Sequence, residues 1–195
     1  DEPLLLDSKG NAIFRHRFLP LANFKGDLNA LYSDILKTLF NTESASHLYL
    51  HNIKKASGEV ALKVGNNDYF ALINVGDSSE LLKSAVELEN VSVEQDEFSD
   101  GLFGKINQDS STLNLLIGSR KFTEGWSSWR VSTMGLLNMG RGEGSQIIQL
   151  FGRGVRLKGR NFSLRRTPIN EMPKGLGLDK LETLNIFGIK ADYMA

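Results

Sequence analysis

The chain has 195 residues, 41% of them apolar and 24% charged, which is enough for one packed domain or one domain with a small appendage. Its 23 basic and 23 acidic residues cancel, so the composition excludes a globally basic nucleic-acid binder and leaves room only for a local basic patch. Cysteine is absent, which excludes disulfides and thiolate chemistry, and no apolar run reaches membrane-spanning length, so we expect a cytoplasmic protein without a membrane partner.

The first third of the chain predicts short β-hairpins and one amphipathic helix. Leu4–Phe18 predicts a hairpin around a Ser-Lys-Gly turn. From about Lys25 to Phe40, apolar residues recur at helical spacing, which predicts a helix whose apolar stripe lies in a core or an interface. Leu48–Ile53 and Glu59–Val64 flank a short turn and predict a second hairpin. We assign residues 1–66 to an N-terminal hairpin and helix elaboration that leads into the main domain.

The only metal-like pattern in this region is a pair of histidines, His47 and His51. Two histidines four residues apart can bind a metal on a helix, where they share a face. Here they lie in strand-like sequence with no third ligand nearby. We therefore predict no metal site in the chain.

From Asp68 onward, apolar strand-like segments alternate with helical ones. Such alternation predicts βαβ units with right-handed crossovers, and hence an α/β fold with a mostly parallel sheet flanked by helices. We assign residues 67–195 to this main domain. The expected strands are Phe70–Val75, Asn90–Gln95, Leu113–Gly118, Val131–Met139 and Leu184–Ile189, and the expected helices lie at about 81–88, 100–107 and 145–157.

The last of these helices has two different faces. At about 100° per residue, Gln149, Arg153 and Arg156 project within roughly 60° of one another. Two guanidinium groups one turn apart match an anion between them, and phosphate is the anion that their planar fork fits. The alternative is an exposed basic face with surface salt bridges. The opposite face is apolar and carries Ile147, Ile148, Phe151 and Val155.

Two blocks of this region resemble helicase motifs. The pattern Gln149-x-x-Gly152-Arg153-x-x-Arg156 resembles the sixth motif of superfamily 2 helicases and translocases, and Gly118–Trp126 resembles their fifth motif. A stretch of about forty residues, KFTEGWSSWRVSTMGLLNMGRGEGSQIIQLFGRGVRLKG, is similar in sequence to type III restriction enzyme Res subunits. The resemblance implies a RecA-like, P-loop NTPase-type fold, the second such domain of a helicase motor. That family often has an acidic residue or Asn where this chain has Ser127.

The resemblance also implies roles for individual residues. Gln149, Arg153 and Arg156 are the expected catalytic residues, with the arginines at the γ-phosphate of ATP. Nucleotide binding is expected of Glu124, Gly125 and Gly152. The expected nucleic-acid contacts are Gly118, Ser119, Arg120, Lys121 and Thr123, which offer backbone N–H groups, hydroxyls and positive charge to phosphates.

Two features of the fifth-motif block have alternative interpretations. Glu124 can orient a water, position an arginine or bond a ribose hydroxyl, or it can pair with Arg130 or Arg141 to stabilise the loop. Trp126 and Trp129 can stack on bases or pack the loop onto the core.

The sequence lacks the other half of an ATP site. It contains no G-x-x-x-x-G-K-[ST] loop, and no Asp-Glu pair follows an apolar strand. ATP and magnesium are therefore expected to bind mainly to an upstream RecA-like domain of a longer protein, and this segment alone is expected to be inactive. The other expected partners are DNA and, as a candidate, a methyltransferase (modification) subunit.

Two other functions compete with the motor. A helicase-like module that binds nucleic acid or a partner without ATPase activity is the main alternative. The Gly-rich run Gly140–Ser145 also follows a strand and opens a helix, as a dinucleotide-binding turn does, but its spacing is G-x-G-x-G and no acidic residue follows at a strand end.

Overall fold

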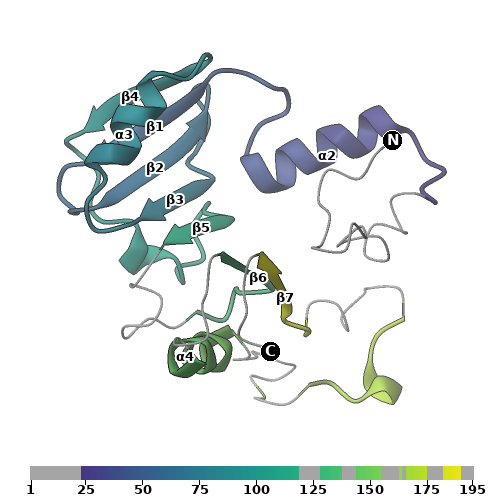
Figure 1. Ribbon diagram of the computed structural model, residues 1–195. Helices are drawn as coiled ribbons and strands as arrows, with labels where there is room; N and C mark the ends of the chain where they lie inside the picture. Colours follow the sequence, from purple (N-terminus) through teal and green to yellow (C-terminus); the bar gives the residue numbers. More distant parts are fainter. Residues whose placement is uncertain are drawn as a thin grey trace.

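The computed structural model describes residues 23–118, 128–137, 144–154, 163, 166–174 and 182–189 (Figure 1). These residues form an α/β fold with a mixed five-stranded sheet, a separate two-stranded sheet and three helices. The helices are α2 (Leu28–Phe40), α3 (Ser79–Val86) and α4 (Gly144–Gly154). The strands are β1 (Leu48–Ile53), β2 (Glu59–Val64), β3 (Ala71–Asn74), β4 (Val91–Asp96), β5 (Leu115–Gly118), β6 (Thr133–Leu137) and β7 (Asn185–Ile189), and two 3-10 turns are η1 (Phe103–Lys105) and η5 (Ile169–Glu171).

The predicted α/β class is confirmed, but the prediction of a mostly parallel sheet is wrong. The five strands lie in the order β4-β1-β2-β3-β5; β2 is antiparallel to both neighbours, whereas β1 pairs with β4, and β3 with β5, in parallel. The reason is the length of the connections. Parallel neighbours need a crossover of a dozen or more residues, and the segments before and after β2 are too short for one.

The predicted hairpin Leu48–Ile53 and Glu59–Val64 is present with these bounds, and β2 is the central strand of the sheet. A close approach between Gly58 and Gly76 sets its position against β3. Gly58 has φ +78°, and a Cβ there would collide with the carbonyl oxygen of Gly76. The hairpin predicted at Leu4–Phe18 lies outside the described residues, and the boundary between residues 1–66 and 67–195 stays a prediction.

The core of the five-stranded sheet has a layer on each face. Leu50, Val60 and Ile73 form one layer with Ala85 of α3, which lies across this face in Figure 1. The other layer lies beneath the segment around η1 and consists of Ile53, Ala61, Leu72, Ile106 and Leu113.

Strand β5 is not fully buried, although Leu115, Leu116 and Ile117 are all apolar. It lies at the edge of the sheet, and Leu115 and Ile117 are 45% and 44% exposed. Their side chains project from the same face as Ile73, because parallel register pairs Ile117 with Ile73. Helix α3 covers the β1–β4 end of this face. The apolar residues of β5 therefore lie at an edge of the sheet that is only partly covered.

Helix α2 forms where the periodicity predicts, and its apolar stripe is largely uncovered in this structure. None of its residues is buried, and Leu28 and Tyr32 are 68% and 55% exposed. Among the described residues, its C-terminal end is held by the following contacts. Phe40 packs edge-on against Phe70 at 5.1 Å, and Asn41, in the left-handed conformation, donates from Nδ2 to the carbonyl oxygens of Tyr69 and Thr112 at 3.0 Å.

The two-stranded sheet carries α4. Strands β6 and β7 pair in parallel, and Leu136, Ile147 and Leu150 form a small core between β6 and the helix. The approach to β7 is held by Glu182, which accepts hydrogen bonds from the backbone N–H and the hydroxyl of Thr167 at 2.6 and 2.7 Å. No helix among the described residues has the length and apolar character needed to cross a membrane.

Candidate functional site

The structure describes part of the predicted site. Gly118 ends β5, Gln149 and Gly152 lie on α4, and Arg153 belongs to the same helix. The other predicted site residues lie outside the described residues: Ser119, Arg120, Lys121, Thr123, Glu124, Gly125 and Arg156. The described part of the site is therefore one helix and one strand end.

Helix α4 is anchored by one face and presents another to solvent. Ile147 is 2% exposed and Leu150 is 9% exposed against Leu136 of β6. Gln149 is exposed, as expected for a residue about 200° around the helix from Ile147. The predicted apolar face needs one correction, because Ile148 is 71% exposed and Leu150 takes its place. The helix rests on β6 through positions i, i+3 and i+4, that is 147, 150 and 151, so position 148 falls outside the contact.

Gly152 lies on α4 with open space around it. A Cβ added at this position meets no atom within 4 Å. Glycine in a helix interior is destabilising relative to alanine by about 1 kcal/mol, because it has more backbone entropy to lose on folding. No neighbour among the described residues requires this loss.

The carboxyl end of β5 lies beside a buried amide that no motif in the sequence marks. Asn74 ends β3, pairs with Gly118 in parallel register and is 1% exposed. Its Nδ2 and Oδ1 atoms have no hydrogen-bond partner. An unpaired buried amide is destabilising by about 1–3 kcal/mol. The sequence signal, a single Asn at the end of the apolar run Phe70–Val75, is too common to identify such a position.

Glu59 lies opposite Asn74 and is a buried carboxylate that holds the segment around η1 in place. Antiparallel register places the two residues side by side, and Glu59 is 4% exposed. Its Oε2 atom accepts hydrogen bonds from the backbone N–H groups of Leu102 and Phe103, at 2.7 and 3.3 Å. The carboxylate thus caps the start of η1 and holds this segment on the sheet.

A second titratable cluster lies on β1 and β4. His51 is 8% exposed, and its Nε2 lies 3.4 Å from Glu94 Oε2 without forming a hydrogen bond. Burial lowers the pKa of His51, Lys63 lowers it further, and Glu94 and Asp96 only partly oppose them. Next to it, the Tyr69 hydroxyl donates to Asp96 Oδ2 at 2.8 Å.

The pKa values of this tyrosine and aspartate move apart. Burial, with the nearby Asp96 carboxylate, raises the pKa of Tyr69. Burial also acts to raise the pKa of Asp96, but hydrogen bonds from Ser99, Tyr69 and Phe98 outweigh it and hold that pKa well below its usual range. The Tyr69 hydroxyl therefore stays protonated as a fixed donor to an ionised carboxylate.

Arg130 is occupied by backbone carbonyls. Its guanidinium donates to the carbonyl oxygen of Ile106 at 2.8 Å and to that of Leu113 at 3.0 Å. These bonds tie the segment before β5 to the segment before β6. Whether Glu124 also reaches Arg130 falls outside the described residues. Trp129, next to it, is 45% exposed, so its side chain is not packed into the core.

Among the described residues, no group of three or more His, Asp or Glu side chains is placed to hold a metal ion. Comparisons with protein-family models, curated proteins and solved structures found no match to this chain.

Proposed function

We propose that the chain is the C-terminal RecA-like motor domain of a cytoplasmic, ATP-dependent DNA helicase or translocase, similar to the type III restriction Res subunits. In this proposal Gln149 and Arg153 of α4, and Arg156 three residues later in the sequence, contribute to an ATP site shared with an upstream RecA-like domain. That upstream domain holds ATP and magnesium for the most part. DNA binds at the block that begins at Gly118, and a methyltransferase subunit is a candidate partner.

The observation that carries the proposal is the combination of an anchored face and an open face on α4. Ile147 and Leu150 fix the helix on β6, while Gln149 is exposed and Gly152 has open space where a Cβ would be. An exposed glycine in a well-anchored helix allows another molecule or domain to approach the backbone closely. This arrangement suits a helix that faces a nucleotide held across a cleft by another domain.

The chemistry of the proposed site is electrostatic. A phosphoryl group in transfer spreads negative charge over its equatorial oxygens, and an arginine supplied from a second domain stabilises that charge. Gln149 fixes the geometry of the arginines or bonds the nucleotide. Because the arginines and the phosphates belong to different domains, ATP binding closes the pair and hydrolysis opens it, which moves the block at Gly118 relative to DNA.

The test is ATP hydrolysis by the full-length protein that contains this chain, with and without duplex DNA at fixed salt. We expect DNA-stimulated turnover that falls by a factor on the order of 10³ in Arg153→Ala, with ATP binding nearly unchanged. Arg153→Lys should recover little of this loss, because an ammonium lacks the planar fork.

Two glutamines provide the matched comparison. Gln149→Ala should lower turnover, whereas Gln146→Ala, on the same helix but outside the motif pattern, should leave it unchanged. Near-normal turnover in Arg153→Ala would remove the assignment of that arginine. Absence of turnover under every DNA condition, from folded protein, would favour the module that binds without an ATP cycle.

A further inference from the structure

Helix α2 carries an apolar stripe that no other described part of the chain covers. No residue of the helix is buried, and four of its apolar side chains are between 36% and 68% exposed: Leu28, Tyr32, Ile35 and Leu39. These four side chains, the α2 seam, follow one another at intervals of four, three and four residues. Alternation of four and three is the spacing by which helices pack along one another in a coiled coil.

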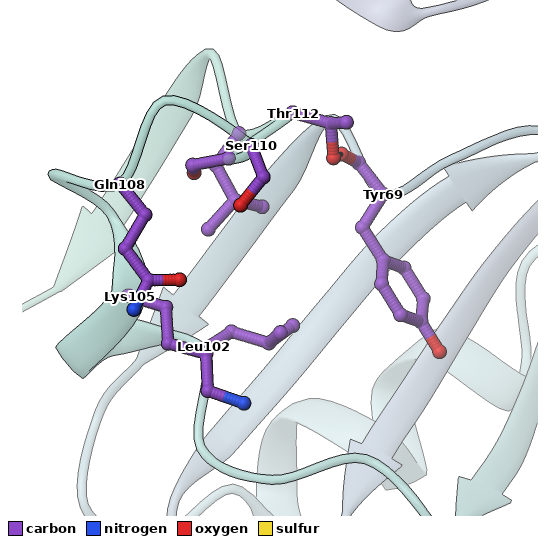
Figure 2. Close-up of a pocket in the computed structure, with 8 residues that line it drawn as sticks. Tyr69, Leu102, Lys105, Gln108, Ser110 and Thr112 are labelled. Atoms are coloured by element: carbon purple, nitrogen blue, oxygen red, sulfur yellow. Dashed lines mark hydrogen bonds between the residues drawn. The ribbon is translucent and has the colours of Figure 1, made fainter.

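The described contacts of α2 with the sheet lie at its C-terminal end. Asn41 donates from Nδ2 to the carbonyl oxygens of Tyr69 and Thr112, both at 3.0 Å, and the Thr112 hydroxyl donates to the same Tyr69 oxygen at 2.7 Å. Figure 2 shows Thr112 beside Tyr69, at the rim of a small pocket that both residues line. A helix of 13 residues is only marginally stable in water unless its apolar face is packed, so the α2 seam needs a partner.

The α2 seam is symmetric along the helix, which suits a second copy of the same chain. The inner pair of seam residues, Tyr32 and Ile35, lies at equal distances from a point midway along the helix. The outer pair, Leu28 and Leu39, lies at equal distances further out. A two-fold axis through that point places Leu28 of one copy against Leu39 of the other and Tyr32 against Ile35, so the seam is complementary to itself.

Apolar side chains flank the α2 seam, and charged side chains lie away from it. The half-buried Leu31 and Leu36 project on either side, about 70° from the centre of the seam, and the same two-fold axis exchanges them. Asp34 and Lys37 project more than about 120° from that centre. A second copy can therefore cover the seam without burying a charge.

The attachment of α2 to its sheet selects the antiparallel orientation of such a pair. A parallel pair would bring the two C-terminal ends together, and with them the two five-stranded sheets that are attached there (Figure 1). An antiparallel pair places the two sheets at opposite ends of a helix that is about 20 Å long. It also sets the positive end of each helix dipole beside the negative end of the other, which is favourable.

We propose that α2 is a dimerisation element, in which the α2 seams of two copies of this chain pack antiparallel across a two-fold axis. A contact one helix wide and about 20 Å long belongs to the small interfaces, below about 1,200 Å² in total, so we expect a Kd on the order of 10–100 µM. The contact uses no residue of α4 or of the block that begins at Gly118. The dimer therefore requires neither ATP nor DNA.

The experiment is analytical ultracentrifugation of the 195-residue chain between about 5 and 500 µM, where we expect a reversible monomer–dimer equilibrium. Tyr32→Glu places a charge in the α2 seam and should weaken the dimer at least about tenfold. Ser33→Glu is the matched control, because it adds the same charge on the face of α2 away from the seam. Its Kd should equal that of the unchanged chain.

The orientation is read from disulfides, because the chain has no cysteine of its own. The two-fold axis brings position 28 of one copy next to position 39 of the other and leaves like positions about 16 Å apart along the helix axis, too far for a disulfide. A mixture of the Leu28→Cys and Leu39→Cys variants should therefore oxidise to the crossed dimer at least about tenfold faster than either variant forms a dimer alone.

Three results would overturn the proposal, whatever the ATPase experiment shows. A chain that stays monomeric at about 500 µM would leave the α2 seam to another domain of the full-length protein. Equal effects of Tyr32→Glu and Ser33→Glu would place the dimer contact elsewhere on the surface. Disulfides between like positions that form as fast as the crossed ones would exclude the antiparallel pair.

Discussion

Asn74 and Asn114 are amides with opposite environments, and this contrast can be tested at the scale of single residues. Asn74 is buried with both side-chain atoms unpaired. Asn114 is exposed but donates to the carbonyl oxygens of Thr38 and Leu39 at 3.0 and 3.3 Å and to Asn41 Oδ1 at 3.2 Å. Replacing the asparagine by an apolar residue therefore removes a buried amide without hydrogen-bond partners at position 74. At position 114 it removes an amide that donates several hydrogen bonds.

We expect Asn74→Val to leave the free energy of unfolding unchanged or to raise it by about 1 kcal/mol, because the buried amide has no partner to lose. Asn114→Val should lower it by about 1–2 kcal/mol, because the C-terminal end of α2 loses its attachment. Denaturant unfolding of both variants measures the difference. If Asn74→Val is as destabilising as Asn114→Val, the amide of Asn74 has a partner in solution.

At the scale of elements, Gly152 separates stability from function on α4. Gly152→Ala should raise the free energy of unfolding of the chain by about 0.5–1 kcal/mol, since alanine is the better helix former and its Cβ meets no atom. In the full-length protein the same change should lower ATP turnover, because the Cβ occupies the space that the nucleotide or upstream domain needs. Thermal unfolding and ATP hydrolysis, measured on the same variant, test the two effects.

Gly104→Ala is the control for Gly152→Ala. A Cβ at Gly104 also meets no atom within 4 Å, but this glycine lies on η1, away from α4. ATP turnover by the Gly104→Ala variant of the full-length protein should equal that of the unchanged protein. If Gly152→Ala keeps full turnover as well, the open face of α4 is not where the nucleotide binds.

The elements also show what the sequence could and could not predict. β1 and β2 have the predicted bounds, because two β-rich runs around a short turn have few alternatives. The sequence patterns did not predict the mixed sheet, because strand order depends on connection lengths across the whole chain. A local pattern contains no information about those lengths. On α4, helical spacing correctly exposes Gln149, but whether Ile148 or Leu150 is buried depends on how the helix lies on β6.

The candidate site was predictable only as far as its motifs reach. The blocks at Gly118 and Gln149 can be recognised from their sequence motifs. Asn74 cannot, because its unpaired state follows from register with Glu59 and Gly118 and from burial, neither of which is written in a single residue.

At the scale of the whole molecule, His51 couples the central sheet to pH. The carboxylates of Glu94 and Asp96 face it from β4, Lys63 faces it from β2, and the Tyr69 ring lies 5.5 Å from its own. Burial and Lys63 outweigh the two carboxylates, so the pKa of His51 is lowered from 6.5 in the folded chain. A lowered histidine pKa means that the unfolded chain takes up the proton first.

Its contribution to stability is therefore full above about pH 6.5 and is lost as pH falls through the window between the unfolded and folded pKa values. We expect the free energy of unfolding to decrease as pH falls below about 6.5, and we expect His51→Gln to flatten this slope because glutamine does not titrate. His47→Gln is the matched control, since His47 lies just before β1 and its Nε2 is hydrogen-bonded to the Ser92 hydroxyl of β4 at 2.8 Å. Urea unfolding across this pH range measures both slopes, and a slope left unchanged by His51→Gln would mean that the buried imidazole is not the group that destabilises the sheet in acid.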